Sequence, residues 1–325
     1  MRNPTIKEVA AKSGVGVGTV SRVLNNSPQI SEKTRKKVMA AIEELNYIPN
    51  VAGKRLSQSR SNVIAVIVPV INHPYFAKLI AELELEADLR GYTLLVASSQ
   101  RRIEKEKEIL RRLAQNEADG AIFVTHYEHE EKEFKNLAIV SIDRHLGENI
   151  PIVTSNNYEA TRQGVEYLIE KGCKKIAFIG TKPGQASEVS LREQAYIDVM
   201  KEHNREPIVI NENISHGEEE KLIDNLSKTH PDFDGIFVSG CILANVVYNK
   251  IKEKGTKVPD DMQIVSYDGE FSIDNKAHIT TLEQPLNLMA KRCIELLISL
   301  IEKNSQEVEM MNKFDCRFIK AETTK

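Results

Sequence analysis

A group of polar side chains near the amino terminus has the residue types that form hydrogen bonds with nucleic acid. These residues alternate with valines that recur at helical spacing, so one helix would bury the valines and expose the polar side chains. Hydroxyl, amide and guanidinium groups on such a helix can donate or accept at base edges or phosphates. The exposed set is Thr19, Ser21, Arg22 and Asn25.

Three short helices are expected to position these side chains. Thr5 followed by Glu8 forms a capping box, which predicts a helix start, and Gly14 stands where that helix should end. The next apolar pattern begins only a few residues later, which is the spacing of a helix-turn-helix. Ser31 is expected to cap a third helix that Asn46 can end. A small three-helix bundle with a solvated basic face is the alternative interpretation.

The charge of the chain is divided unequally. Residues 1–60 hold eleven Lys or Arg and four Asp or Glu, a net charge of +7; because the whole chain carries −3, the other 265 residues carry −10. A basic head on an acidic body is typical of a polyanion-binding module attached to a larger domain. Chance variation in surface charge is the alternative.

After Asn62, short β-branched runs alternate with amphipathic helices. We expect strands over 63–68, 92–97, 120–124 and 138–142, helices over 73–90 and 104–116, and a second round of the same rhythm over 157–281. This order predicts parallel βαβ units with helices on both faces, arranged as two similar α/β lobes. Ligands of such open sheets bind beyond the carboxyl ends of the strands.

The head resembles the DNA-binding headpiece of the LacI/GalR family of bacterial repressors. The resemblance runs over residues 5–56 and rests on TVSRVLN, the S-x-K-T-R helix start and NYIPN. It implies that residues 17–25 are a recognition helix in the major groove, with Arg22 reading a guanine. The implied DNA-binding residues are Thr5, Val17, Gly18, Thr19, Ser21, Arg22, Asn25, Thr34, Asn50, Lys54, Arg55 and Leu56.

The same resemblance implies a hinge helix over residues 50–56. Such a helix is ordered on DNA, pairs with its copy in a dimer and inserts Leu56 into the minor groove. A simple linker is the alternative. Gly16 replaces a serine that commonly contacts phosphate, and Gly18 occupies a specificity position. Glycine offers only its backbone amide, so we expect specificity to depend on Val17, Arg22 and DNA shape.

The body resembles the family's effector domain, which is itself similar to periplasmic sugar-binding proteins, to about residue 320. The matching segments are NHPYF, SIDR, NNYEATRQGVEYLIEKGCKKIAFIG, SLREQAY, IVSYDG and TTLEQP. The resemblance implies a small-molecule effector, stacked on aromatic rings and hydrogen-bonded through its hydroxyls. The implied effector-binding residues are Tyr75, Phe76, Asp143, Asn156, Arg192 and Asp268.

Three of these residues also have ordinary structural interpretations. Asp143 could form a loop salt bridge with Arg144, Arg192 could bind a helix terminus, and Phe76 could belong to the core. The chain departs from the family pattern at Asn156, at Ala195 and at residues 239–241, where Ser-Gly-Cys replaces a common Asn-Asp pair. These changes remove polarity, so we expect a neutral sugar or sugar derivative, of the kind that sucrose, fructose and ribose regulators bind.

Other functions lack support in the sequence. There is no GxSxG or Walker motif, so we expect no enzyme and no cofactor. His126 and His129 in HYEHEEKE are expected in a solvated charge cluster on a surface loop, so we expect no metal. The longest apolar run, residues 63–68, is too short to span a membrane. Four widely spaced cysteines and the absence of a leader favour the cytoplasm.

Together these patterns predict an α/β protein with a three-helix helix-turn-helix headpiece and a two-lobed, periplasmic-binding-protein-like domain with parallel sheets. The expected divisions are a headpiece over 1–49, a hinge and linker over 50–60, and an effector-binding and dimerisation domain over 61–325. We expect a homodimeric, cytoplasmic repressor of a sugar operon that binds a near-palindromic DNA operator. Control by a corepressor or partner protein, a soluble sugar receptor and a sugar-modifying enzyme are the alternatives.

Overall fold

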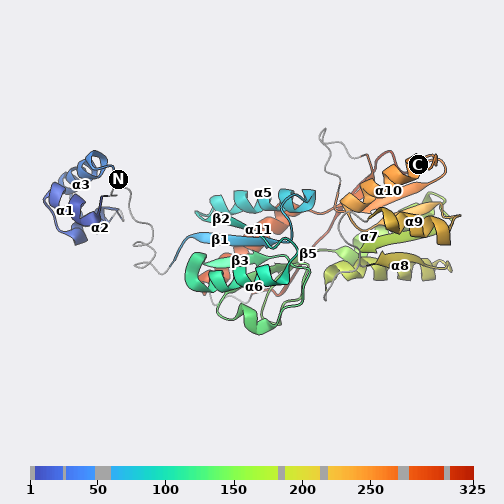
Figure 1. Cartoon of the computed structure of the whole chain (residues 1–325), viewed down its shortest axis with the longest axis horizontal. Helices are drawn as coiled ribbons and strands as arrows, with labels where there is room; N and C mark the ends of the chain where they lie inside the picture. The colour runs from blue at the N-terminus through green and yellow to red at the C-terminus, as the bar shows by residue number, and fades with distance from the viewer. Residues whose placement is uncertain are drawn as a thin grey trace. The chain divides into compact units, whose positions relative to one another are not determined.

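The computed structural model describes residues 4–24, 27–47, 60–181, 187–212, 219–269, 278–303 and 308–325. The chain divides into two compact units, Met1–Ser61 and Asn62–Lys325, each described by itself (Figure 1). Most of the predicted hinge lies outside the described residues, and the predicted DNA contacts that fall there are Asn25, Asn50, Lys54, Arg55 and Leu56. No helix within the described ranges is long and apolar enough to cross a membrane.

The first unit holds three helices: α1 (Ile6–Ser13), α2 (Val17–Leu24) and α3 (Glu32–Glu44). The capping box of Thr5 and Glu8 is confirmed, as is the N-cap role of Ser31. Gly14 ends α1 with φ 67°, a left-handed conformation that glycine adopts without strain. The apolar faces of the three helices meet in one small core that includes Val9, Val20 and Val38.

The first lobe of the second unit is built on a six-stranded parallel sheet. Its order is β11-β5-β4-β3-β1-β2. Helices α5 (Pro74–Asp88) and α6 (Ile103–Arg112) lie on opposite faces. A π-helical turn, Leu113–Glu117, and a 3-10 turn, Glu131–Phe134, follow α6. The strands are β1 (Val63–Val68), β2 (Thr93–Ser98), β3 (Gly120–Phe123), β4 (Ala138–Ile142), β5 (Ile152–Ser155) and β11 (Met311–Phe314).

The second lobe repeats this arrangement with the order β12-β10-β9-β8-β6-β7. All its pairs are parallel except β10 with β12. Helices α7 (Asn157–Glu170) and α8 (Leu191–Glu202) cover one face, and α9 (Glu220–Thr229) and α10 (Cys241–Glu253) cover the other. The 3-10 turn Glu188–Ser190 precedes α8. The strands are β6 (Ile176–Thr181), β7 (Ile208–Glu212), β8 (Gly235–Val238), β9 (Gln263–Tyr267), β10 (Thr280–Glu283) and β12 (Arg317–Ile319).

The two lobes are joined by three crossings of the chain. The chain passes from β5 to α7, from β10 to α11 (Leu286–Glu302), and from β11 to β12. Helix α11 returns to the first lobe, where Met289, Ile294 and Leu297 pack with α5 in the same core as β1. The two α/β lobes are therefore confirmed, but the first lobe is completed by residues from near the carboxyl end.

Candidate functional site

The exposed face of α2 carries the predicted DNA-binding side chains of the head. Val20 and Val23 are buried, whereas Val17 is 42% exposed and Arg22 is exposed. Gly16 and Gly18 have open space where a Cβ would stand, so packing does not require glycine at either position. The carbonyl of Arg22 accepts from the Ser27 amide at 2.9 Å, while its guanidinium makes no hydrogen bond with the described residues and is available for a base edge.

Two of the other predicted contacts have structural roles in the head. The hydroxyl of Thr5 accepts from the Glu8 amide at 3.4 Å, and Thr34 pairs with the Ser31 hydroxyl at 2.9 Å. A residue that the sequence analysis did not single out, Arg35, donates from α3 to the carbonyls of Val23 and Ser27 at 3.4 and 3.0 Å. Arg35 therefore holds the carboxyl end of α2 and fixes the direction of its exposed face.

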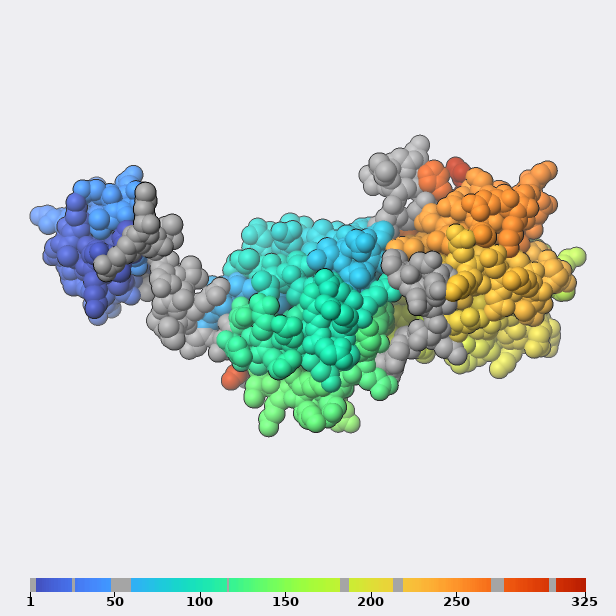
Figure 2. All heavy atoms as spheres, in the orientation of Figure 1, coloured from blue at the N-terminus to red at the C-terminus, as the bar shows by residue number. Residues whose placement is uncertain are grey.

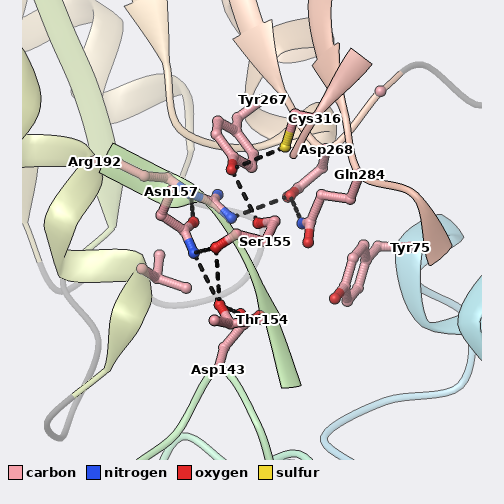
Figure 3. Close-up of polar contacts among 12 residues, drawn as sticks. Tyr75, Asp143, Thr154, Ser155, Asn157, Arg192, Tyr267, Asp268, Gln284 and Cys316 are labelled. Atoms are coloured by element: carbon pink, nitrogen blue, oxygen red, sulfur yellow. Dashed lines mark hydrogen bonds and ion pairs between the residues drawn. The ribbon is translucent and has the colours of Figure 1, made fainter. Parts of the chain in front are cut away.

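In the second unit, polar side chains gather where the chain crosses between the lobes (Figure 3). Parallel strands of both sheets bring their carboxyl ends to this region, as expected for a ligand site in open α/β sheets. We call these residues the inter-lobe cluster: Tyr75, Asp143, Thr154, Ser155, Asn157, Arg192, Tyr267, Asp268 and Gln284.

Arg192 is the central cation of the inter-lobe cluster and is almost fully buried. Its Nε donates to Asn157 Oδ1 at 2.6 Å, and its second nitrogen lies 3.4 Å from Asp268 Oδ1. Its guanidinium stacks on Tyr267, 3.6 Å from the ring centroid. Arg192 therefore does not act by binding a helix terminus. Its contacts hold the guanidinium between the Asp268 carboxylate and the Tyr267 ring.

Asp143 is buried at the end of β4 and has a different set of partners. Its Oδ1 accepts from the Thr154 hydroxyl at 2.5 Å. Arg144 is also buried, but its Nε donates to the Thr125 carbonyl at 2.7 Å and another nitrogen donates to the Ser187 hydroxyl. Burial raises the pKa of Asp143, although attraction by Arg144 opposes that shift.

Two buried polar atoms in the inter-lobe cluster have no partner within the described residues. They are Tyr75 Oη and Gln284 Oε1, and Figure 3 shows both side chains at the same edge of the cluster. Burial raises the pKa of Tyr75 well above its usual value, so the phenol keeps its proton and can donate. Buried polar groups normally have partners, so an unpaired donor and an unpaired acceptor indicate a place for a ligand hydroxyl.

The cluster contains four of the six predicted effector-binding residues: Tyr75, Asp143, Arg192 and Asp268. Asn156 points elsewhere and donates to Asp315 Oδ1 at 3.0 Å, while the next residue, Asn157, is buried against Arg192. Phe76 packs in the first-lobe core against His73 and Tyr75, which is the structural alternative for that ring.

Asn157 and Gln284 were not predicted to be site residues. Both lie at chain crossings, where periodicity gives no signal.

His126 and His129 are half-buried, and the imidazole of His129 is not exposed at all, so the expectation of a solvated cluster is wrong for the histidines, although Glu128, Glu130 and Glu131 are exposed. His129 Nε2 lies 2.8 Å from Glu106 Oε2, and Nδ1 lies 2.7 Å from Glu133 Oε2. The 3-10 turn buries Phe134, whose ring lies 5.6 Å from the His129 ring, and brings Glu133 to His129 Nδ1. Within the described residues there is no group of three side chains arranged to hold a metal ion.

Comparison with known proteins identifies the family. The sequence profile described as "Bacterial regulatory proteins, lacI family" matches residues 5–50, and "Periplasmic binding protein-like domain" matches residues 165–324. The ribose operon repressor of Halalkalibacterium halodurans is 34% identical over 99% of this chain and 97% of its own length. The chain belongs to the lacI family of bacterial regulatory proteins.

Two further relatives agree with this assignment. The sucrose operon repressor of Streptococcus mutans is 32% identical over 91% of this chain and 92% of its own length. A solved structure, the transcriptional regulator CelR in complex with cellobiose, has a TM-score of 0.73 and 26% identity and covers 99% of this chain and 100% of its own. This lacI-family chain is a DNA-binding transcription regulator and not an enzyme.

Proposed function

We propose that this lacI-family regulator represses a sugar-utilisation operon and is released from its operator by a small sugar. The observation that carries the proposal is the inter-lobe cluster, where Tyr75 Oη and Gln284 Oε1 stand buried and unpaired beside the Arg192–Asp268 pair. A sugar hydroxyl both donates and accepts, so one hydroxyl could satisfy both atoms. The ribose and sucrose operon repressors among the relatives support the same ligand class.

The operator is proposed to be near-palindromic because a two-fold protein dimer presents two copies of α2. An apolar face on the first lobe supports dimer formation: Leu85 on α5, Leu89 at its C-cap and Val96 on the edge strand β2 are exposed. Figure 2 shows the surface of this lobe, with the residues of α5 and β2 in cyan and blue. Exposed apolar side chains beside an unpaired sheet edge are typical of an interface. A regulator of this kind acts on DNA in the cytoplasm.

The test begins with selection of bound fragments from genomic DNA by the full chain, followed by operator titration with and without sugars. We expect one preferred near-palindromic site, and weaker binding to that site when ribose, fructose or sucrose is added. Deletion of residues 1–60 should abolish DNA binding and leave sugar binding intact. Equal affinity for the selected site and bulk fragments, at every sugar concentration, would overturn the proposal.

Arg22→Ala tests the recognition helix. Loss of a bidentate contact with guanine should reduce discrimination at one base pair by about 1 to 3 kcal/mol. Lys54→Ala is the control, because loss of a phosphate contact should weaken all duplexes and flatten the salt dependence. An Arg22→Ala variant as selective as the parent would show that α2 does not read the operator through this residue.

A further inference from the structure

A cavity of about 320 Å³ opens at the carboxyl ends of β6, β7 and β8, beside the start of α8. Its volume lies at the lower end of the range for small-molecule pockets, about 300–1,000 Å³. Neither the predicted effector residues nor the inter-lobe cluster includes a residue of its lining. It therefore needs its own explanation.

The cavity is rich in hydrogen-bond acceptors. Asn211 Nδ2 donates to Glu193 Oε2, which leaves Asn211 Oδ1 buried and unpaired within the described residues. Three hydroxyl side chains, Thr181, Ser190 and Ser239, complete the polar lining. A carboxylate, an amide oxygen and several hydroxyls around one space suit a ligand that presents several hydroxyl donors.

The cavity also has an apolar side and a negative charge. Phe178 and Val189 contribute apolar lining, which suits the C–H face of a sugar ring. Among the described lining residues, Glu193 is charged and no Lys or Arg is present to balance it. A phosphate here would be repelled by Glu193, so an uncharged ring fits the cavity better than a phosphorylated one.

The cavity adjoins the inter-lobe cluster. Ser190 and Glu193 flank Arg192 on the chain, and Ser239 precedes Gly240. A Cβ at Gly240 would lie 3.7 Å from Asp268 Oδ2, and the φ of Gly240 is +150°, so this corner brings the backbone close to the carboxylate. The lining residue Ser239 therefore stands next to the backbone that faces Asp268.

We propose that the cavity is a second subsite for an uncharged glycosyl ring, so that the effector is a two-ring glycoside rather than a free pentose or a sugar phosphate. The first ring contacts the inter-lobe cluster, and the second ring donates hydroxyls to Glu193 and Asn211. The inference rests on the proposed function and specifies the ligand class of the same site.

Calorimetry on the full chain tests the second subsite. The probes are sucrose and cellobiose, with glucose, fructose and ribose as one-ring probes and glucose 6-phosphate as the charged probe. Glu193→Ala should raise the Kd for the preferred disaccharide about tenfold, a typical result of removing a hydrogen bond to a charged group, and leave one-ring binding unchanged. Gln194→Ala is the matched control, because Gln194 bonds Asp198 on the same helix and does not line the cavity.

Thr181→Trp is a second variant, placed at the exposed end of β6, that should fill the cavity and exclude a disaccharide while one-ring sugars still bind. Tighter binding of ribose or glucose 6-phosphate than of either disaccharide would overturn the inference. The absence of measurable binding of both disaccharides would also overturn it. Equal losses for one-ring and two-ring sugars in Glu193→Ala would do the same. Operator selection without sugar is measured in parallel. If the chain selects a preferred operator and any of these outcomes is found, only the second subsite is refuted. If the chain selects no preferred operator, the proposed function itself is refuted.

Discussion

The two lobes share a topology and place an aspartate at the same point, yet they surround it differently. Asp143 follows β4 in the segment IVSID, and Asp268 follows β9 in IVSYD. Both have left-handed backbone conformations, with φ of +60° and +80°. Asp268 is paired with Arg192 and accepts from Gln284 at 2.6 Å, whereas Asp143 accepts from Thr154, beside an arginine bound to carbonyls and a hydroxyl.

Both lobes therefore place a carboxylate at the same point of the backbone. The residues around each carboxylate decide how well its negative charge is stabilised. Left-handed non-glycine residues cost free energy and concentrate at functional sites, and an aspartate with this conformation follows the corresponding strand in each lobe. In the second lobe the carboxylate is held by a partner cation. In the first lobe burial raises the pKa of Asp143, so its negative charge is less stable. The second lobe therefore offers a fixed charge pair and the first lobe a buried acid that a ligand can engage.

The largest expected effect comes from Arg192→Ala. The change leaves Asp268 without its cation and removes the stacking on Tyr267, so we expect about 3 to 5 kcal/mol less stability of the second unit. Sugar binding should fall at least about 100-fold, equivalent to roughly 3 kcal/mol. Calorimetry and urea unfolding measure the two losses.

Arg162→Ala is the matched control in the same lobe. Arg162 forms an exposed surface pair with Glu202, at 2.7 Å, and pairs of this kind contribute little to stability. Equal losses in the two variants would show that the buried pair has no special role.

Asp268→Asn should have the next largest effect. Asparagine tolerates the left-handed backbone, so the main change is the loss of charge beside Arg192. We expect about 2 to 4 kcal/mol lower unfolding free energy, because a buried cation loses its counter-charge. Unchanged stability in urea would mean that Asp268 and Asp143 have equivalent surroundings, and the comparison between the lobes would fail.

The histidines of the first lobe should show opposite pH dependence. Burial, with Arg144 and Arg101 nearby, lowers the pKa of His126 to about 3. As pH falls, His126 is protonated in the unfolded chain before it is protonated in the folded chain. Its contribution to stability is therefore complete above the ordinary histidine pKa, about 6.5, and is lost as pH falls toward 3. In the parent chain this loss should lower the free energy of unfolding by up to about 1.4 kcal/mol per pH unit, and His126→Gln should abolish it. Urea unfolding between pH 6.5 and 5 measures the difference.

His129 provides the control three residues away. Burial opposes its protonation, but hydrogen bonds to Glu106 and Glu133 outweigh burial and raise the pKa of His129. Its contribution is therefore complete below the ordinary histidine pKa and is lost as pH rises through the raised value. NMR titration should find His129 charged at a higher pH than His126; the reverse order would contradict the assigned contacts.

Asp143→Asn should have the smallest effect on stability, and its sign should be opposite to that of Asp268→Asn. Because the pKa of Asp143 is raised in the folded chain, its contribution is present below the ordinary aspartate pKa and is lost as pH rises through the raised value. The amide avoids this loss and can still accept from Thr154. We expect a slightly higher Tm at pH 7, and a gain that disappears near pH 3. A lower Tm at pH 7 would show that the carboxylate charge stabilises the first lobe.

Local patterns predicted the elements, whereas contacts between distant segments were not visible in the sequence. The capping box at Thr5, Gly14 and the strand from Val63 depend on neighbouring residues and are confirmed. β5 is a four-residue strand that was not predicted, so the turn from β5 into α7, which leaves Asn156 half-buried and buries Asn157, was not visible either. Gln284 enters the cluster through the crossing that sends α11 back to the first lobe.

The histidine loop shows the same limit. Glu residues around His126 and His129 indicate solvent exposure when the segment is considered alone. The structure instead places Glu106, from α6, against His129. A pairing over 23 residues leaves no local signal in charge or periodicity.

The most direct measurement is the effect of the preferred sugar on operator affinity, followed by fluorescence anisotropy in the parent chain and in Arg192→Ala. The account predicts that saturating sugar weakens operator binding by about 5- to 150-fold in the parent, and that operator weakens sugar binding by the same factor. The Arg192→Ala variant should bind the operator tightly, with the same affinity in the presence and absence of the sugar. An operator affinity that no sugar changes in the parent, or that the same sugar still lowers in Arg192→Ala, would contradict control through the inter-lobe cluster.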